Sequence, residues 1–181
     1  APDMAIRRLS NRPQKVSQTG NAVLYFVDVE DGSLIKKLDT GVGMSDDPEG
    51  IGRPNGLNSP ALVDIDGDSV ADYVYVGDLF VNLWKIDVRN ADPNRWGFSF
   101  GGGGVPEPLF VATAGAGGSI RQPITSRPST NRWQGSTTNG VQIFFGTGKY
   151  FEPEDKSTLS SRVQSFYGIF DDHSTQITKA D

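Results

Sequence analysis

Short apolar runs separated by glycine, proline and aspartate recur along the chain, whereas stretches with the period of an amphipathic helix are scarce. Runs of this kind, rich in Val, Ile, Tyr and Phe, predict β-strands. The clearest predicted strands cover residues 22–29, 34–39, 60–64, 73–77, 82–88, 109–113, 141–148 and 165–171. Between the first two, the pair Asp31-Gly32 indicates a hairpin turn. The fold class that follows is all-β.

The remaining segments give weaker signals. The expectations are short strands at 4–9, 123–128 and 175–178, a polar loop over 129–140, and one short helical turn within 152–161. Residues 89–104 end in four glycines, and we expect them to form an irregular, flexible excursion at the surface.

The segments repeat in a common order: a proline, a strand, an apolar strand that ends in glycine, and an aromatic residue shortly before an aspartate. The copies span roughly residues 1–58, 59–118 and 119–181, a period of roughly 60 residues. Repeats of four short strands are typical of β-propellers, which close with about four to eight blades. The sequence therefore predicts one domain over 1–181 that supplies about three blades of a larger ring.

Aspartates dominate the stretch before the strand at 73–77. Asp64, Asp66, Asp68 and Asp72 stand within nine residues, with Gly67 among them and no basic residue downstream until Lys85. The offsets 1, 3, 5 and 9 are those of side-chain ligands in a calcium loop, and position 7, which is Val70, supplies its backbone carbonyl. We therefore predict a Ca²⁺ site formed by Asp64, Asp66, Asp68, Val70 and Asp72.

The flanks of this loop argue against an EF-hand. That motif has a helix on each side and a bidentate Glu at position 12, but position 12 here is Tyr75 and both flanks have strand-like sequences. The prediction is a calcium loop between two β-strands. The alternative is an aspartate-rich hairpin turn that stays solvated without a metal ion.

Charge and composition narrow the function. The net charge of −5 and the pI near 4.9 argue against a nucleic-acid partner, which usually meets a basic surface. The chain contains no apolar stretch long enough for a transmembrane helix. It has no cysteine and hence no disulfide or thiol chemistry. An acidic, cysteine-free and calcium-dependent chain fits the outside of a bacterial cell, where free Ca²⁺ is high.

Other chemical candidates are weak. His173 is the single histidine, and we expect it to be a solvated loop residue beside two aspartates. The segment Gly146 to Lys149 lacks the spacing of a phosphate-binding loop. Trp84 is predicted to be a core residue, whereas Trp96 and Trp133 lie in predicted loops and are candidates for exposed contacts.

Several segments resemble the C-terminal β-propeller of the PilC/PilY type IV pilus tip adhesins. The resemblance rests on residues 22–28, 31–32, 38–41, 63–68, 71–80, 82–87, 144–150 and 164–171, which occur in the order of that family. Two departures are visible. Residues 12–20 lack the Gly-Asn-Gly motif that usually precedes the segment matching Ala22, and the upstream blades and N-terminal adhesive region of the family have no counterpart here.

The resemblance implies a modified, quinoprotein-like β-propeller exported to the bacterial cell surface or fimbrium. It implies a role in pilus biogenesis, cell adhesion and twitching motility, with pilins, minor pilins and other pilus tip components as partners and host surface ligands as further ones. In that family the calcium loop acts as a structural and regulatory switch for pilus extension and retraction. These ligand roles carry over to Asp64, Asp66, Asp68, Asp72 and the carbonyl of Val70.

Two other functions stay open from the residues alone. An integrin-like calcium propeller that binds a protein ligand also has Asp-x-Asp-Gly-Asp loops between strands, and only the segment 146–150 favours the pilus family over it. A quinoprotein dehydrogenase fragment is the enzymatic alternative. Such enzymes commonly place an adjacent cysteine pair beside the quinone, and this chain has no cysteine. We therefore expect a protein that is not an enzyme.

Overall fold

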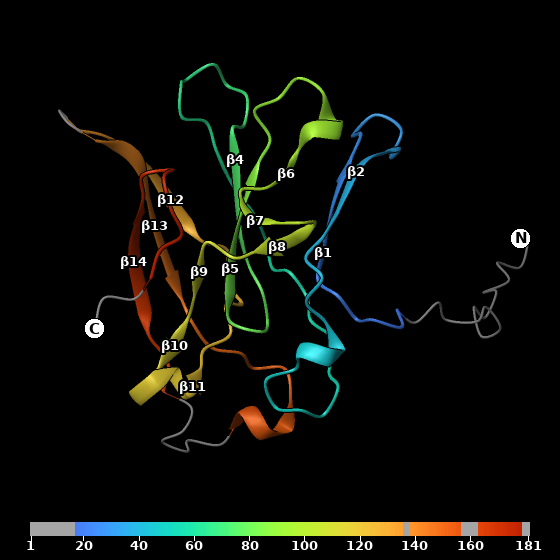
Figure 1. Ribbon diagram of the computed structural model, residues 1–181, viewed down its shortest axis with the longest axis vertical. Coiled ribbons are helices and arrows are strands. Elements are labelled where there is room, and N and C mark those ends of the chain that lie inside the picture. Colours follow the sequence, from blue (N-terminus) through green and yellow to red (C-terminus); the bar gives the residue numbers. More distant parts are fainter. Residues whose placement is uncertain (1–16, 136–137, 157–162, 179–181) are drawn as a thin grey trace, which may run out of the picture.

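The computed structural model describes residues 17–135, 138–156 and 163–178, which form β-sheets joined by loops and short 3₁₀ turns (Figure 1). The strands are β1 (Val23–Val27), β2 (Leu34–Asp39), β3 (Ala61–Val63), β4 (Tyr73–Gly77), β5 (Asn82–Asp87), β6 (Gly97–Phe98), β7 (Phe100–Gly102), β8 (Val105–Glu107), β9 (Phe110–Val111), β10 (Thr113–Ala114), β11 (Ile120–Arg121), β12 (Ser129–Gln134), β13 (Asn139–Gly146) and β14 (Phe166–Asp171). The 3₁₀ turns are η1 (Met44–Asp46), η2 (Pro93–Arg95), η3 (Ala116–Gly118) and η4 (Pro153–Lys156). Within the described residues there is no α-helix, and no helix is long and apolar enough to cross a membrane. The prediction of an all-β fold is confirmed.

The central sheet has the strand order β3-β4-β5-β6, and β9 pairs with the other end of β5. Its strands are antiparallel, and in the ladder Val74 lies opposite Ile86 and Val76 opposite Trp84. All five positions of β4 are buried because both faces of the sheet are covered. A strand covered on both faces has a continuous apolar sequence, which explains why β4 lacks the alternation of a half-exposed strand.

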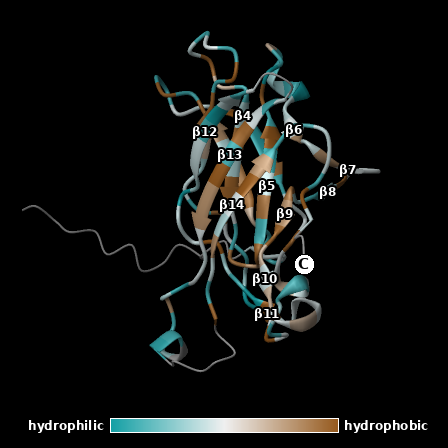
Figure 2. Cartoon of the chain, turned by 90° about the vertical axis from the view of Figure 1, so that its left-hand side faces the viewer, coloured by the Kyte–Doolittle hydropathy of each residue, from teal (hydrophilic) through white to brown (hydrophobic). Residues whose placement is uncertain are grey.

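Successive side chains of β4 enter two different apolar cores, as the period of a strand requires. Tyr73 and Tyr75 belong to one core, which includes Val141, Ile143 and Phe145 of β13. Val74 and Val76 belong to the other, to which Leu24, Phe26 and Leu38 of β1 and β2 contribute. The hairpin β1–β2 and the sheet β12–β13–β14 therefore lie on opposite sides of the central sheet (Figure 1). Figure 2 shows the apolar positions gathered on β4, β5 and β13.

A buried ion pair joins the central sheet to the C-terminal sheet. Lys85 Nζ of β5 lies 2.7 Å from Asp171 Oδ2 at the end of β14, and both side chains are almost fully buried. The hydroxyl of Tyr75 donates to the same carboxylate oxygen at 2.7 Å. Burial lowers the pKa of Lys85, while the contact with Asp171 acts in the opposite direction. Both charges thus have partners, as burial requires.

His173 adds to this contact, so the expectation of a solvated loop residue is wrong. Its Nδ1 lies 2.8 Å from Lys85 Nζ, and its ring stacks on Tyr73 with the centroids 4.8 Å apart. The backbone amide of His173 also donates to Asp171 Oδ1 at 2.8 Å. The sequence shows two aspartates beside this histidine, but not the lysine from a distant strand that lies against its ring.

A second buried carboxylate, Asp78, fixes the turn between β4 and β5. It is fully buried and accepts five hydrogen bonds from neutral donors: the backbone amides of Phe80 and Asn82 and the side chains of Asn55, Asn82 and Trp84. A buried polar group is stable when hydrogen bonds satisfy it in this way. Asp78 thereby ties the turn to the indole of Trp84 and to the loop that contains Asn55.

The outward face of the C-terminal sheet is apolar and exposed. Trp133, Phe144, Phe166 and Phe170 lie on the side opposite to the core, and the exposed fraction of Phe166 is 74%. The rings of Phe144 and Phe170 lie over Gly168 and Gly140, where a Cβ atom would contact them. An exposed aromatic face of this kind is typical of a contact surface.

Three local predictions fail. The segment 123–128 contains only a single bridge from Ile124 to Gly148, and 175–178 forms no strand, although the amide of Ile177 donates to Leu109. The predicted polar loop at 129–140 contains β12, which pairs along its length with β13. Its polar residues do not exclude a strand because few of its side chains enter the core.

The remaining weak predictions differ in outcome. The helical turn expected within 152–161 is η4. Residues 157–162 lie outside the described part of the chain, and so does the strand predicted at 4–9. The excursion at 89–104 is more ordered than expected, because β6 joins the central sheet and β7 pairs with β8. Gly101 is required in this hairpin: its φ is +120° and a Cβ atom would lie 2.2 Å from the carbonyl oxygen of Val105.

We expect the substitution Lys85→Met to lower the free energy of unfolding by about 3–5 kcal/mol, because Asp171 would keep a buried charge without its cation. Urea denaturation of both forms measures the difference. Lys37→Met is the matched control, since its ion pair with Asp39 is exposed and 3.8 Å long, and we expect a change within about 0.5 kcal/mol. Similar small losses in both variants would contradict a structural role for the buried pair.

The position of His173 also predicts a pH dependence. Burial lowers the pKa of His173 below its ordinary value of 6.5, and Lys85 and Arg89 add to this effect against Asp171 and Asp172. The unfolded chain therefore takes up the proton first as the pH falls, so that this contribution to stability is intact above pH 6.5 and is lost below it. We expect the melting temperature to fall between about pH 7.5 and 5.5, and to fall less in His173→Gln. Equal pH profiles for the two forms would refute this role.

Candidate metal site in the β3–β4 loop

The aspartate-rich segment forms the loop that joins β3 to β4, at the top of the molecule in Figure 1. Val63 lies opposite Tyr73 in the ladder of these antiparallel strands, and the amide of Asp72 donates to the carbonyl of Val63 at 2.8 Å. The two ends of the loop are therefore held next to each other by the central sheet. The prediction that strands flank the loop is confirmed, and this excludes the helix–loop–helix geometry of an EF-hand.

Three of the predicted ligands converge in this loop. Asp64, Asp66 and Asp72 each offer one carboxylate oxygen, and these oxygens all lie within 4.8 Å of one another. Asp64 and Asp72 are half-buried, whereas Asp66 is exposed. Two of the predicted ligands thus lie at the fixed ends of the loop, and the third lies in its first half.

Hydrogen bonds within the loop set the direction of these carboxylates. The oxygens of Asp64 accept from the amides of Gly67 and Ser69, at 2.6 and 2.8 Å, and these two bonds are the main reason why the pKa of Asp64 is lowered. Asp72 Oδ2 accepts from the amide of Ile65 at 2.7 Å. Gly67 and Ser69 both have positive φ, +88° and +72°, so the loop turns back over its own carboxylates. The sequence indicates the first of these positions but not the second.

The other two predicted ligands lie differently. The carboxylate of Asp68 is outside the group of three and accepts from the amide of Val70 at 2.7 Å. Val70 has an exposed side chain, as expected of a residue that would contribute only its carbonyl oxygen. The assignment of Asp68 and Val70 as ligands stays a prediction, as does the complete set of five.

Arg132 of β12 contacts this loop. No pattern in the sequence predicted this contact. Its Nη1 donates to the carbonyl of Ile65 at 3.1 Å, and its charge contributes to the lowered pKa of Asp64. The acidic loop is therefore partly neutralised by a residue that lies far away in sequence. No local pattern identifies it, because the contact depends on how the C-terminal sheet packs against the central sheet.

The arrangement of these carboxylates fits the predicted hard-cation site, which stays a prediction. Carboxylates held this close repel one another, and a divalent ion with a preference for oxygen ligands removes that repulsion. Ca²⁺ takes about six to eight oxygens, so three carboxylates leave room for further ligands from the loop or from water.

The remaining candidates from the sequence have structural roles or stay exposed. Trp84 is fully buried, which confirms its assignment to the core. Trp96 packs edge-on against Phe26, and its indole donates to the carbonyl of Asn90 at 2.7 Å. Trp133 lies on the exposed aromatic face, with 48% of its surface accessible. Lys149 forms ion pairs with acidic side chains and is not part of a phosphate loop.

Most of this chain is similar in sequence to known proteins. Residues 12–180 match the family model described as the PilY1 beta-propeller domain. A type IV pilus biogenesis factor PilY1 homolog from Xylella fastidiosa (strain Temecula1) is 39% identical over 165 residues, which cover 89% of this chain and 11% of that protein. The type IV pilus biogenesis factor PilY1 of Pseudomonas aeruginosa (strain PAO1) is 38% identical over 194 aligned residues, which cover 94% of this chain and 15% of that protein.

A solved structure agrees with these relatives. The crystal structure of the Pseudomonas aeruginosa PilY1 C-terminal domain matches with a TM-score of 0.67 at 36% identity, over 87% of this chain and 33% of that chain. The chain thus spans a small part of the curated relatives and about a third of the solved domain. Since the family model covers nearly all of its residues, the chain belongs to the PilY1 β-propeller family.

Proposed function

We propose that this chain is a calcium-binding segment of the propeller in a type IV pilus biogenesis and adhesion protein. Calcium acts in it as a structural ligand and as a switch for pilus extension and retraction. The observation that carries the proposal is the convergence of Asp64, Asp66 and Asp72 at a loop whose ends belong to two paired strands. Asp68 and the carbonyl of Val70 complete the proposed ligand set.

The physical basis of the switch is the difference between the empty and the filled loop. Without a cation, the carboxylates repel one another at short distance and favour an open loop. With Ca²⁺ bound, the same groups connect β3 to the start of β4, and part of the binding free energy stabilises that conformation. An ion that prefers one of two conformations shifts their populations, which is what a switch requires.

The family supports the proposed setting. The relatives are named type IV pilus biogenesis factors, so we place the protein at the bacterial surface or fimbrium, with pilins, minor pilins and other tip components as its partners. Adhesion to host surface ligands and twitching motility belong to the same proposal. The naming of the relatives favours a non-enzymatic role over a quinoprotein dehydrogenase, and a pilus role over an integrin-like propeller.

We also propose that the hairpin β1–β2, the central sheet and the sheet β12–β13–β14 belong to successive blades of a larger ring. The units of the chain are roughly 1–58, 59–118 and 119–181. The central sheet is covered on both faces, whereas the outward face of β12–β13–β14 exposes aromatic rings such as Phe166. The solved relative is about three times as long as its matched part, which leaves room for the further blades that would cover such a face.

Calorimetric titration of Ca²⁺ into the chelator-treated protein, with Mg²⁺ as the comparison ion, tests the site. We expect one Ca²⁺-selective site, and we expect Asp66→Ala or Asp72→Ala to weaken it by about tenfold or more, since each removes one charged ligand. Asp31→Ala is the matched control, because Asp31 lies in the exposed β1–β2 turn and should leave the affinity unchanged. Unchanged Ca²⁺ affinity in both loop variants would leave the loop as a solvated turn.

Limited proteolysis separates the structural from the regulatory part of the proposal. Ca²⁺ should protect the segment 64–72 from cleavage in the native protein and leave it unprotected in Asp72→Ala. In bacteria that produce Asp72→Ala, the number of surface pili should change relative to Asp31→Ala. Protection by Ca²⁺ together with unchanged piliation would restrict the ion to a structural role.

A further inference from the structure

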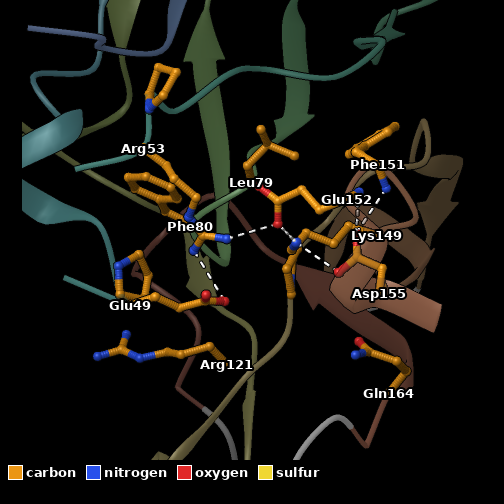
Figure 3. A pocket seen from close by; sticks show the side chains of 14 residues that line it. Glu49, Arg53, Leu79, Phe80, Arg121, Lys149, Phe151, Glu152, Asp155 and Gln164 are labelled. Atoms are coloured by element: carbon orange, nitrogen blue, oxygen red, sulfur yellow. Dashed lines mark hydrogen bonds and ion pairs between the residues drawn. The ribbon is translucent and has the colours of Figure 1, made fainter. Parts of the chain in front are cut away.

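A cleft of about 380 Å³ lies at the end of the molecule opposite to the β3–β4 loop. Four parts of the chain meet there: the loop 48–54, the β4–β5 turn, the segment around β11, and the segment around η4 (Figure 3). Its volume is that of a small-ligand pocket. The proposed calcium function makes no use of it.

One side of the cleft is apolar and rigid. Leu79 and Phe80 of the β4–β5 turn line it, together with Pro48, Pro54 and Pro123. The turn is fixed by the hydrogen bond from the amide of Phe80 to Asp78 at 2.8 Å and by the bond from the amide of Leu79 to the carbonyl of Gly56 at 3.2 Å. An apolar surface of this kind has its final shape before a ligand binds. Less conformational entropy is therefore lost in ordering its side chains on binding.

A network of ion pairs fixes the other walls. Arg53 contacts Asp47 at 2.9 Å. It also pairs with Glu49 and Glu152, each at 3.2 Å, and Lys149 pairs with Glu152 and, at 2.8 Å, with Asp155 (Figure 3). Burial would raise the pKa of Asp155, but the bonds from Lys149 and from two backbone amides outweigh it and lower this pKa to about 2. The hydrogen bonds from Arg53 likewise hold the pKa of Asp47 well below its usual range. The two cations of the network are therefore engaged by carboxylates.

Arg121 is the exception among the basic residues of the cleft. It belongs to β11, lies along the lower side of the cleft in Figure 3, and has no hydrogen-bond or ion-pair partner for its guanidinium among the described residues. A guanidinium binds carboxylates with two parallel hydrogen bonds. Glu49, Glu152 and Asp155 line the same cleft and are paired with Arg53 and Lys149, so Arg121 adds one positive charge that has no carboxylate partner in the described part of the chain and can balance one negative charge on a ligand.

We propose that this cleft binds a small monocarboxylate with an apolar body. The carboxylate pairs with Arg121, and the apolar part packs on Leu79, Phe80 and the neighbouring prolines. The single unpaired cation balances one negative charge. A second charge, as on phosphate, would have no free cation among the described residues of the cleft and would lie near the cleft's carboxylates, while the apolar wall selects an aryl or branched alkyl group. The site is distinct from the aspartate loop and does not depend on its occupancy.

The test compares three probes with one shape and different charge: 4-phenylbutyrate, 4-phenylbutan-1-ol and 4-phenylbutylamine. NMR titrations follow the ¹³C-labelled methyl groups of Leu79, which report binding in the cleft itself. We expect the acid to bind about tenfold more tightly than the alcohol, since one charge-assisted pair distinguishes them, and the amine to bind more weakly than either. Inorganic phosphate should not displace the acid.

The variant Arg121→Gln should reduce the affinity for phenylbutyrate to that of the alcohol, with no change in the affinity for the alcohol. Arg127→Gln is the matched control, since Arg127 is exposed and does not line the cleft, and Asp72→Ala should bind the acid like the native protein. Equal affinities for acid and alcohol in the native protein, retained selectivity in Arg121→Gln, or displacement by phosphate would each overturn the proposal. So would the absence of any shift at Leu79.

Discussion

The contact between Lys85 and Asp171 is the constraint on which the arrangement of the sheets depends. Each of these charges would be unfavourable alone in a dry interface, and each is stabilised only when the central sheet and the C-terminal sheet are in register with one another. The hydroxyl of Tyr75 and the ring of His173 complete the contact from the same two sheets. Apolar packing brings the sheets together, but it tolerates small shifts that a buried ion pair with fixed hydrogen bonds does not. The position of Arg132 beside the aspartate loop follows from the same register.

Local sequence patterns predicted the parts of the structure that depend on neighbouring residues. The continuous apolar run of β4 and the turn at Gly32 indicated strands and a hairpin, and the spacing of Asp64, Asp66 and Asp72 predicted that their carboxylates would meet. These features depend on the pattern of apolar residues in a strand and on the spacing of residues within a turn or loop, and both can be read directly from the sequence. The missed strand has a simple cause. β12 has mostly exposed positions and gave no apolar signal, although its backbone pairs fully with β13.

Long-range polar contacts were beyond the reach of such patterns. Arg132, His173 and Asp78 act on residues brought close by the stacking of sheets or by the return of a loop, and their own neighbours in sequence are ordinary turn and strand residues. Asp78 shows this most clearly, since it accepts five hydrogen bonds in a fully buried site from residues that include the distant Asn55. The cleft around Arg121 is formed by at least four separate segments and has no counterpart in any single stretch of sequence.

An aspartate lies at each end of the strand β4. Asp72 belongs to the aspartate loop, and Asp78 holds the β4–β5 turn that lines the cleft. Because side chains alternate along a strand, inserting or deleting one residue within β4 would exchange its two faces and displace one of these aspartates from its partners. We therefore expect the separation of Asp72 and Asp78 to be constant among homologous propellers.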